Sequence, residues 1–62
     1  MSNPFKVELV KLDKGWGVLV TDTSTGTSAL HEFHYKQMAR LEVDRLMNDP
    51  IESSVFYSRN SK

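Results

Sequence analysis

The apolar residues of this chain change their spacing once, and this change restricts the possible folds more than any other feature. Apolar and charged residues alternate with a period of two in Phe5-Lys6-Val7-Glu8-Leu9, and the bulky residues Trp16, Val18 and Val20 recur with the same period. From Tyr35 onward the apolar residues follow helical spacing instead. Because side chains alternate across a strand but recur every three or four residues along a helix, the pattern predicts strands first and a helix afterwards.

The two alternating segments are predicted to form a β-hairpin. Asp13-Lys14-Gly15 separates them and fits a three-residue loop in which glycine adopts a positive φ. The polar segment from Thr21 to Ser28 contains Gly26, which favours a second turn. One face of the hairpin is bulky and apolar, and it forms the first half of the predicted core: Phe5, Val7, Leu9, Trp16, Val18 and Val20.

Residues 28–34 fit either a third strand or an early start of the helix. On a helical wheel, Leu30 and Phe33 lie opposite the face that carries Ala39. Since one helix cannot bury both sets on a single face, we predict a third strand at residues 28–34. It completes a three-stranded antiparallel meander over residues 4–34.

Residues 35–48 are predicted to form one α-helix. Lys, Gln, Met, Ala, Arg, Leu and Glu favour helix here, and Pro50 disfavours helical backbone at the residue before it. The face expected to pack on the sheet carries Tyr35, Ala39, Val43 and Leu46.

Residues 49–57 are predicted to form a short C-terminal element, which is either a helix or a strand. Asp49-Pro50-Ile51-Glu52 fits the start of a helix, whereas residues 54–58 would suit a fourth strand. Val55, Phe56 and Tyr57 would either close the core or enlarge an exposed surface. The polar residues 58–62 are expected to fray.

The predicted fold class is therefore α+β, in a single small domain over residues 1–62. A three-stranded antiparallel β-meander is followed by one α-helix packed on the sheet and by the short C-terminal element. So small a core offsets the entropy of folding with little to spare, so burial against a partner, including a second copy of the chain, would add stability.

The absence of cysteine excludes several chemical classes. Disulfides, thiolate metal sites and thiol nucleophiles are impossible in this chain. No stretch approaches the ~18 apolar residues of a membrane span, and the first residues do not resemble a signal peptide. We therefore expect a cytoplasmic protein without a membrane partner.

No group of side chains predicts catalysis or a cofactor. His31 and His34 would point to opposite faces of the third strand, which does not suit a shared metal ion. The available carboxylates and hydroxyls match no catalytic motif: Thr27, Ser28, Glu32, Glu42 and Asp44. We expect neither an enzyme nor a metal site.

A second, narrower apolar strip lies beside the predicted buried face of the helix. It consists of Met38 and Leu41, next to Arg45. These residue types are enriched in protein interfaces, so we predict that the strip binds protein. Glu42 lies between the two faces and should pair with Arg45 or a lysine, or reach solvent. The first functional hypothesis is a small non-catalytic regulator or inhibitor of the kind that bacteria and phages encode, which occupies a partner protein's surface. A homodimer through the same strip is a further expectation.

The alternative hypothesis is a nucleic-acid-binding module that uses the sheet face. It requires Lys6, Lys11 and Lys14 to converge with Trp16, whose indole would stack on a base. Eight basic residues balance eight acidic ones, so there is no basic excess to neutralise phosphates. Nucleic acid is therefore the less favoured partner.

The predicted order of elements over residues 4–48 resembles one family of DNA-binding domains. These are the small domains at the N-termini of phage-type integrases, in which three strands precede a helix. The resemblance concerns element order and no sequence motif. It implies contact between the sheet and the major groove of DNA, although the basic sheet face of such domains has no counterpart in this sequence.

Overall fold

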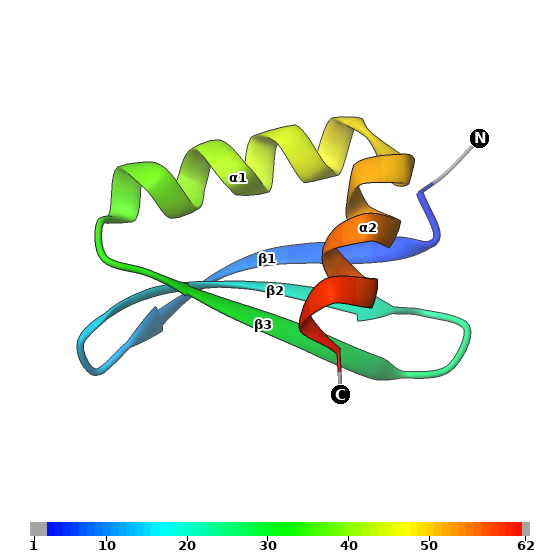
Figure 1. Cartoon of the computed structure of the whole chain (residues 1–62), viewed down its shortest axis with the longest axis horizontal. Helices are drawn as coiled ribbons and strands as arrows, with labels where there is room; N and C mark the ends of the chain where they lie inside the picture. Colours follow the sequence, from blue (N-terminus) through cyan, green and yellow to red (C-terminus); the bar gives the residue numbers. More distant parts are fainter. Residues whose placement is uncertain (1–2, 62) are drawn as a thin grey trace.

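The computed structural model describes residues 3–61 and shows an α+β fold with two helices. Strands β1, β2 and β3 form one antiparallel sheet in that order. Both helices lie on the same side of the sheet (Figure 1). The five elements are β1 (Phe5–Leu12), β2 (Gly15–Asp22), β3 (Thr27–Phe33), α1 (Lys36–Asn48) and α2 (Pro50–Asn60). The predicted meander and the helix after it are confirmed, but the fold has two helices instead of the one predicted, because the C-terminal element is also a helix.

The register of the sheet turns the predicted apolar face of the hairpin toward the helices. Val7 pairs with Val20, Leu9 pairs with Val18, and β3 continues the first row with Ala29. Val18 and Val20 are completely buried. The other members of the predicted half-core pack against them as partly buried side chains: Phe5, Val7, Leu9 and Trp16.

Both connections in the meander depend on a glycine at positive φ. Gly15 has φ +150° and pairs with Leu12 as the first residue of β2, so the first loop contains only Asp13 and Lys14. The predicted three-residue loop is therefore one residue too long. A Cβ atom at Gly15 would lie 2.6 Å from the carbonyl oxygen of Phe33, which leaves no space for a side chain. Gly26 has φ +77° in the second turn, as its position predicted.

Helix α1 buries three of the four residues predicted for its inner face. Ala39, Val43 and Leu46 are buried in the core. Tyr35 is the exception: it precedes the helix as its N-cap, with extended backbone, and 67% of it is exposed. Its ring meets the edge of His34 instead of the sheet. The prediction for Tyr35 failed because the helical wheel was started one residue before the helix begins.

The C-terminal element is the helix α2. Of the two alternatives predicted for this segment, the short helix is therefore correct and the fourth strand is wrong. The Asp49 carboxylate accepts hydrogen bonds from the backbone N–H groups of Ile51 and Glu52, at 3.0 and 3.3 Å. Pro50 occupies the first turn, where its missing N–H costs nothing. The helix continues to Asn60, so residues 58–60 are helical and not frayed, while Lys62 lies outside the described residues.

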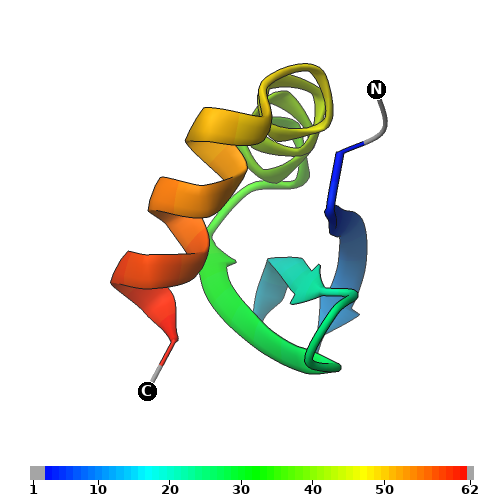
Figure 2. The same cartoon turned by 90° about the vertical axis from the view of Figure 1, so that its right-hand side faces the viewer.

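The two helices divide the sheet between them. Helix α1 packs mainly on β1 and β2, and α2 turns away from its end and runs beside β3 (Figure 2). Phe56 of α2 is buried and closes the core, as one of the two interpretations of the C-terminal segment predicted. Among the residues that the structure describes, no buried side-chain nitrogen or oxygen lacks a hydrogen-bond partner. Neither α1 nor α2 has the length and apolar character of a membrane-spanning helix.

In the described part of the chain no helix covers the opposite face of the sheet, which carries a smaller apolar cluster. The side chains of Val10, Leu12 and Leu30 close over Gly17, which is buried although it lies on the uncovered face. A Cβ atom at Gly17 would lie 2.8 Å from Cδ1 of Leu30. The third-strand residue Leu30 therefore packs away from the main core.

Candidate protein-binding surface

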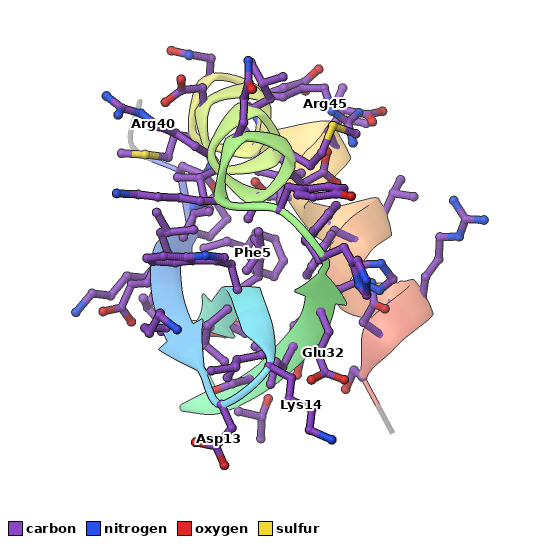
Figure 3. All side chains as sticks on the ribbon, turned by 90° about the vertical axis from the view of Figure 1, so that its left-hand side faces the viewer. Phe5, Asp13, Lys14, Glu32, Arg40 and Arg45 are labelled. Atoms are coloured by element: carbon purple, nitrogen blue, oxygen red, sulfur yellow. The ribbon has the colours of Figure 1, made fainter. Side chains whose placement is uncertain are left out.

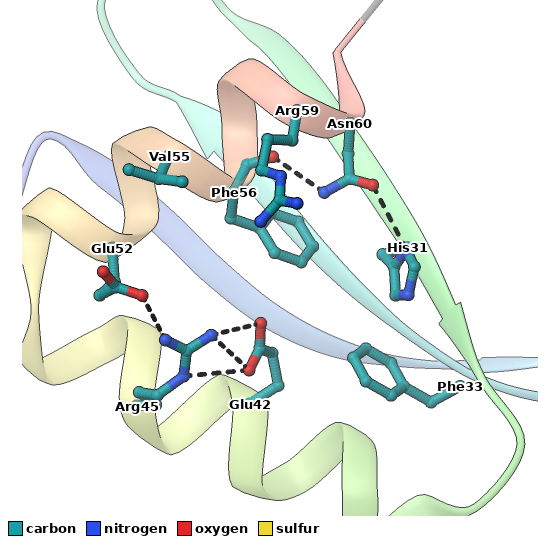
Figure 4. A pocket seen from close by; sticks show the side chains of 9 residues that line it. All are labelled: His31, Phe33, Glu42, Arg45, Glu52, Val55, Phe56, Arg59 and Asn60. Atoms are coloured by element: carbon teal, nitrogen blue, oxygen red, sulfur yellow. Dashed lines mark hydrogen bonds and ion pairs between the residues drawn. The ribbon is translucent and has the colours of Figure 1, made fainter.

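A groove of about 440 Å³ lies in the angle between α1 and α2, next to β3 (Figure 4). Phe33 from β3 and Phe56 from α2 supply apolar rings to its lining, and Val55 adds an aliphatic side chain. The remaining lining residues are polar or charged and come from β3 and both helices: His31, Glu42, Arg45, Glu52, Arg59 and Asn60. The groove thus combines an aromatic lining with charged side chains.

Arg45 connects the two helices through ion pairs. Its Nη2 atom lies 2.8 Å from both carboxylate oxygens of Glu42, and its Nη1 atom donates to Glu52 of α2. These bonds, chiefly those with Glu42 and then that with Glu52, raise the pKa of Arg45 above its usual value. Of the alternatives predicted for Glu42, namely Arg45, a lysine or solvent, the structure shows the pair with Arg45. Two carboxylates therefore hold the Arg45 guanidinium in place across the angle between the helices.

Arg59 differs from Arg45 in having no acidic partner among residues 3–61. Both ion pairs of this part of the chain involve Arg45, and the Arg59 guanidinium makes no hydrogen bond to any described residue. It extends from α2 and lines the groove, as Phe56 does (Figure 4). Among the described residues, one guanidinium at the groove therefore has acidic partners and the other has none.

His31 forms the β3 side of the groove and is held by Asn60. The side-chain Nδ2 of Asn60 donates to the carbonyl oxygen of Phe56 at 2.9 Å, so its Oδ1 faces Nδ1 of His31 at 3.3 Å as an acceptor. A proton on Nδ1 of His31 would complete this hydrogen bond. Its ring meets Phe33 and Phe56 edge-on, with centroid distances of 4.9 and 6.2 Å. This histidine completes the aromatic lining of the groove.

The two histidines do not come together. His34 lies beyond the end of β3 and contacts Tyr35, while His31 faces α2. Within residues 3–61 no three histidine or carboxylate side chains are grouped as metal ligands.

The predicted strip leads along α1 into the groove. Met38 and Leu41 are 54% and 59% exposed, and Leu41 lies one helical turn before Arg45 on the same side of the helix. Arg45 itself lines the groove. The structure therefore joins the three predicted protein-binding residues to a concave site that the sequence did not indicate. We call the strip Met38, Leu41 and Arg45 together with the groove the helix surface.

The four residues of the alternative hypothesis do not form one site. Lys11 pairs with Trp16 and shares its face of the sheet, whereas Lys6 is an odd number of residues away from Lys11 and points to the opposite face. Lys14 lies at the hairpin tip and points away from the helices (Figure 3). Trp16 is contacted instead by two ammonium groups, with Nζ of Lys11 at 5.2 Å and Nζ of Lys36 at 5.0 Å from its ring. The indole packs against the core, as expected for a structural tryptophan.

Glu52, Arg59 and Asn60 are the residues of the groove that sequence reasoning missed. The Asp49-Pro50 start of a helix was visible in the sequence, and continuing that helix for three turns would have placed Val55 and Arg59 on one side of it. The polar Ser53 and Asn60 interrupt the apolar pattern of this segment, so its inner face was not apparent.

Comparison with known proteins leaves the chain without a relative from which a function could be carried over. No protein-family model matches it, and neither a curated protein nor a solved structure shows significant similarity to it. Its function must therefore be argued from the geometry of the helix surface.

Proposed function

We propose that this chain is a small non-catalytic regulator or inhibitor that binds a partner protein through the helix surface. The observation that carries the proposal is the position of Met38 and Leu41, both more than half exposed on a helix whose other face is buried. They lie on the same helix as the groove residues Glu42 and Arg45. A bacterial or phage origin and a cytoplasmic location belong to the same proposal.

The chemistry of the helix surface supports protein binding. Aromatic residues, methionine and arginine are enriched in protein interfaces, and all three occur here. Arg45 is already oriented by Glu42 and Glu52, so less side-chain entropy is lost when a partner binds it. The small core of such a chain leaves it marginally stable, so a partner that covers apolar surface would stabilise the folded state.

Capture experiments with matched variants test the proposal. Immobilised wild-type chain is exposed to a lysate of the organism that encodes it, beside Met38→Glu and Leu41→Lys. Both variants should lose the captured partner while their circular dichroism and melting temperature stay close to wild type, because both positions are exposed. Met47→Lys is the control, since Met47 is 58% exposed on α1 but lies about half a turn away from Met38. Unchanged capture by both strip variants would contradict the proposal.

Self-association through the strip is tested separately by light scattering over a wide concentration range. A dimer that Leu41→Lys converts to a monomer would assign the strip to a homodimer. The groove would then be the part of the helix surface left for another partner.

The second candidate function is nucleic-acid binding near Trp16. It is favoured by the two ammonium groups of Lys11 and Lys36 beside the indole. A fluorescent single-stranded oligothymidylate should then bind with an affinity that falls steeply between about 50 and 200 mM salt. A flat salt response, or no binding at low salt, would dispose of this candidate.

A further inference from the structure

The two arginines of the groove differ in their pairing within residues 3–61. Glu42 and Glu52 both direct carboxylate oxygens to Arg45, so the two acidic residues of the lining are already engaged. Arg59 has no acidic partner within residues 3–61. An anionic group that enters the groove can therefore pair with Arg59 without displacing either of the ion pairs between described residues.

The lining of the groove also contains apolar and aromatic side chains. Phe33, Phe56 and the edge-on ring of His31 line the groove with Val55. The volume of about 440 Å³ lies in the range of ~300–1,000 Å³ that is typical of ligand sites, which is room for a few side chains. The groove therefore suits a ligand with a small apolar part next to a single negative charge.

We infer that the groove binds an acidic peptide segment in which an aspartate or glutamate lies beside an apolar side chain, with Arg59 pairing with the carboxylate. This inference rests on the proposed function and names the kind of segment that the partner protein supplies. A guanidinium binds a carboxylate through two parallel hydrogen bonds, and the neighbouring rings would cover the apolar side chain.

Two other anions fit the groove less well. Recognition of a chain's C-terminal carboxylate uses nests of backbone N–H groups, whereas the flanks of α1 and α2 present side chains and use their N–H groups within the helices. A phosphate group carries nearly two negative charges, whereas Arg59 supplies one positive charge that is not already paired within residues 3–61. The single charge of a carboxylate side chain is the better match.

NMR titration of the isotope-labelled full chain with short peptides tests the inference. The probe is acetyl-Leu-Glu-Leu-amide, and its neutral control of the same shape is acetyl-Leu-Gln-Leu-amide. The acidic peptide should shift the Arg59 side-chain N–H and the backbone amides of Val55 and Phe56, with about tenfold higher affinity than the neutral peptide. Acetyl-leucine, which carries a terminal carboxylate, should bind more weakly than the acidic peptide.

Two arginine variants separate the charge of Arg59 from general charge effects. In Arg59→Gln the affinities for the acidic and neutral peptides should become equal. Arg40→Gln should keep the difference, because Arg40 leaves α1 on the side opposite to Arg45 (Figure 3). Preserved dispersion of the other amide signals would show that both variants are folded.

Equal affinity of the acidic and neutral peptides for the wild type would overturn the inference, as would shifts outside the groove or a difference that persists in Arg59→Gln. The proposed function is judged by Met38→Glu and Leu41→Lys, neither of which changes Arg59. Partner capture that depends on the strip but survives Arg59→Gln would therefore reject the inference and leave the proposed function standing.

Discussion

The hydroxyl group of Ser53 in α2 donates a 2.6 Å hydrogen bond to the carbonyl oxygen of Leu46 in α1, and Ser53 is completely buried. The same oxygen accepts from the backbone N–H of Asp49 and from Nδ2 of Asn3, each at 3.3 Å. These bonds join both helices and the segment before β1 at one atom. They set the angle between α1 and α2 and so shape the groove.

Removing the buried hydroxyl group of Ser53 should weaken the connection between α1 and α2 and lower the stability of the protein. Ser53→Ala removes one donor to the Leu46 carbonyl oxygen and should lower the free energy of unfolding by about 1 kcal/mol. Ser54→Ala changes an exposed position of the same helix and controls for the higher helix propensity of alanine. Urea unfolding measures both variants, and equal stability of the two would contradict the role assigned to Ser53.

The glycine at the start of β2 should tolerate substitution less well than the glycine of the second turn. Gly15→Ala places Cβ 2.6 Å from the rigid backbone oxygen of Phe33, at φ +150°. Gly26→Ala also requires a positive φ, at about 1–2 kcal/mol, but no atom lies within 4 Å of the new Cβ. Thermal unfolding should therefore show a larger loss of stability for Gly15→Ala. A larger loss of stability for Gly26→Ala would contradict the close approach of the Phe33 carbonyl oxygen to Gly15.

The carboxylate that begins α2 should contribute to the stability of this helix. Asp49→Ala removes the acceptor for the N–H groups of Ile51 and Glu52 and should cost about 1 kcal/mol. Asp44→Ala, at an exposed position within α1, is the control and should have a smaller effect. Far-ultraviolet circular dichroism and urea unfolding measure the difference, and similar losses for both variants would argue against the cap.

The carboxyl group of Asp22, at the turn after β2, makes the stability of the protein depend on pH. The pKa of Asp22 is lowered from 3.8, first by the hydrogen bond from the Ser24 hydroxyl and then by that from the Ser24 backbone N–H. A lowered pKa in the folded state means that the stabilisation is present above the unfolded value of 3.8 and is lost as the pH falls through the folded value.

Removing the Ser24 hydroxyl should weaken this dependence. In Ser24→Ala the pKa of Asp22 should rise toward 3.8, because the largest cause of its shift is gone. Carbon-detected NMR titration of the carboxyl group measures this directly. Ser54→Ala, on the distant helix, should leave the pKa of Asp22 unchanged, and the same result for Ser24→Ala would refute the assigned cause.

Periodicity was sufficient to predict the faces of the sheet and most of α1. Val18, Val20, Ala39 and Leu46 are buried as expected, because alternation and helical spacing are local properties that burial then follows. Gly15 and Gly26 were equally predictable, since few other residues adopt their backbone angles. Tyr35 failed for a local reason: the helix begins one residue later than its composition suggested.

The candidate sites depended on relations that no local pattern contains. Lys36 of α1 reaches Trp16 of β2, a contact between two elements that the spacing of neither one indicates. The exposed strip with Met38 and Leu41 was predicted from helical spacing. The groove beside the same helix was not predicted, because β3 and α2 also contribute to its lining.

The sequence by itself determined the order of the strands, the turn glycines and the inner face of α1, because each follows from the backbone preferences and spacing of neighbouring residues. Only the tertiary structure decided which charged side chains share the groove. Arg45 meets Glu52, and Arg59 has no acidic partner within residues 3–61, because the hydrogen bonds at the Leu46 carbonyl oxygen set the path of α2. That path depends on contacts between residues distant in sequence, which spacing alone does not encode.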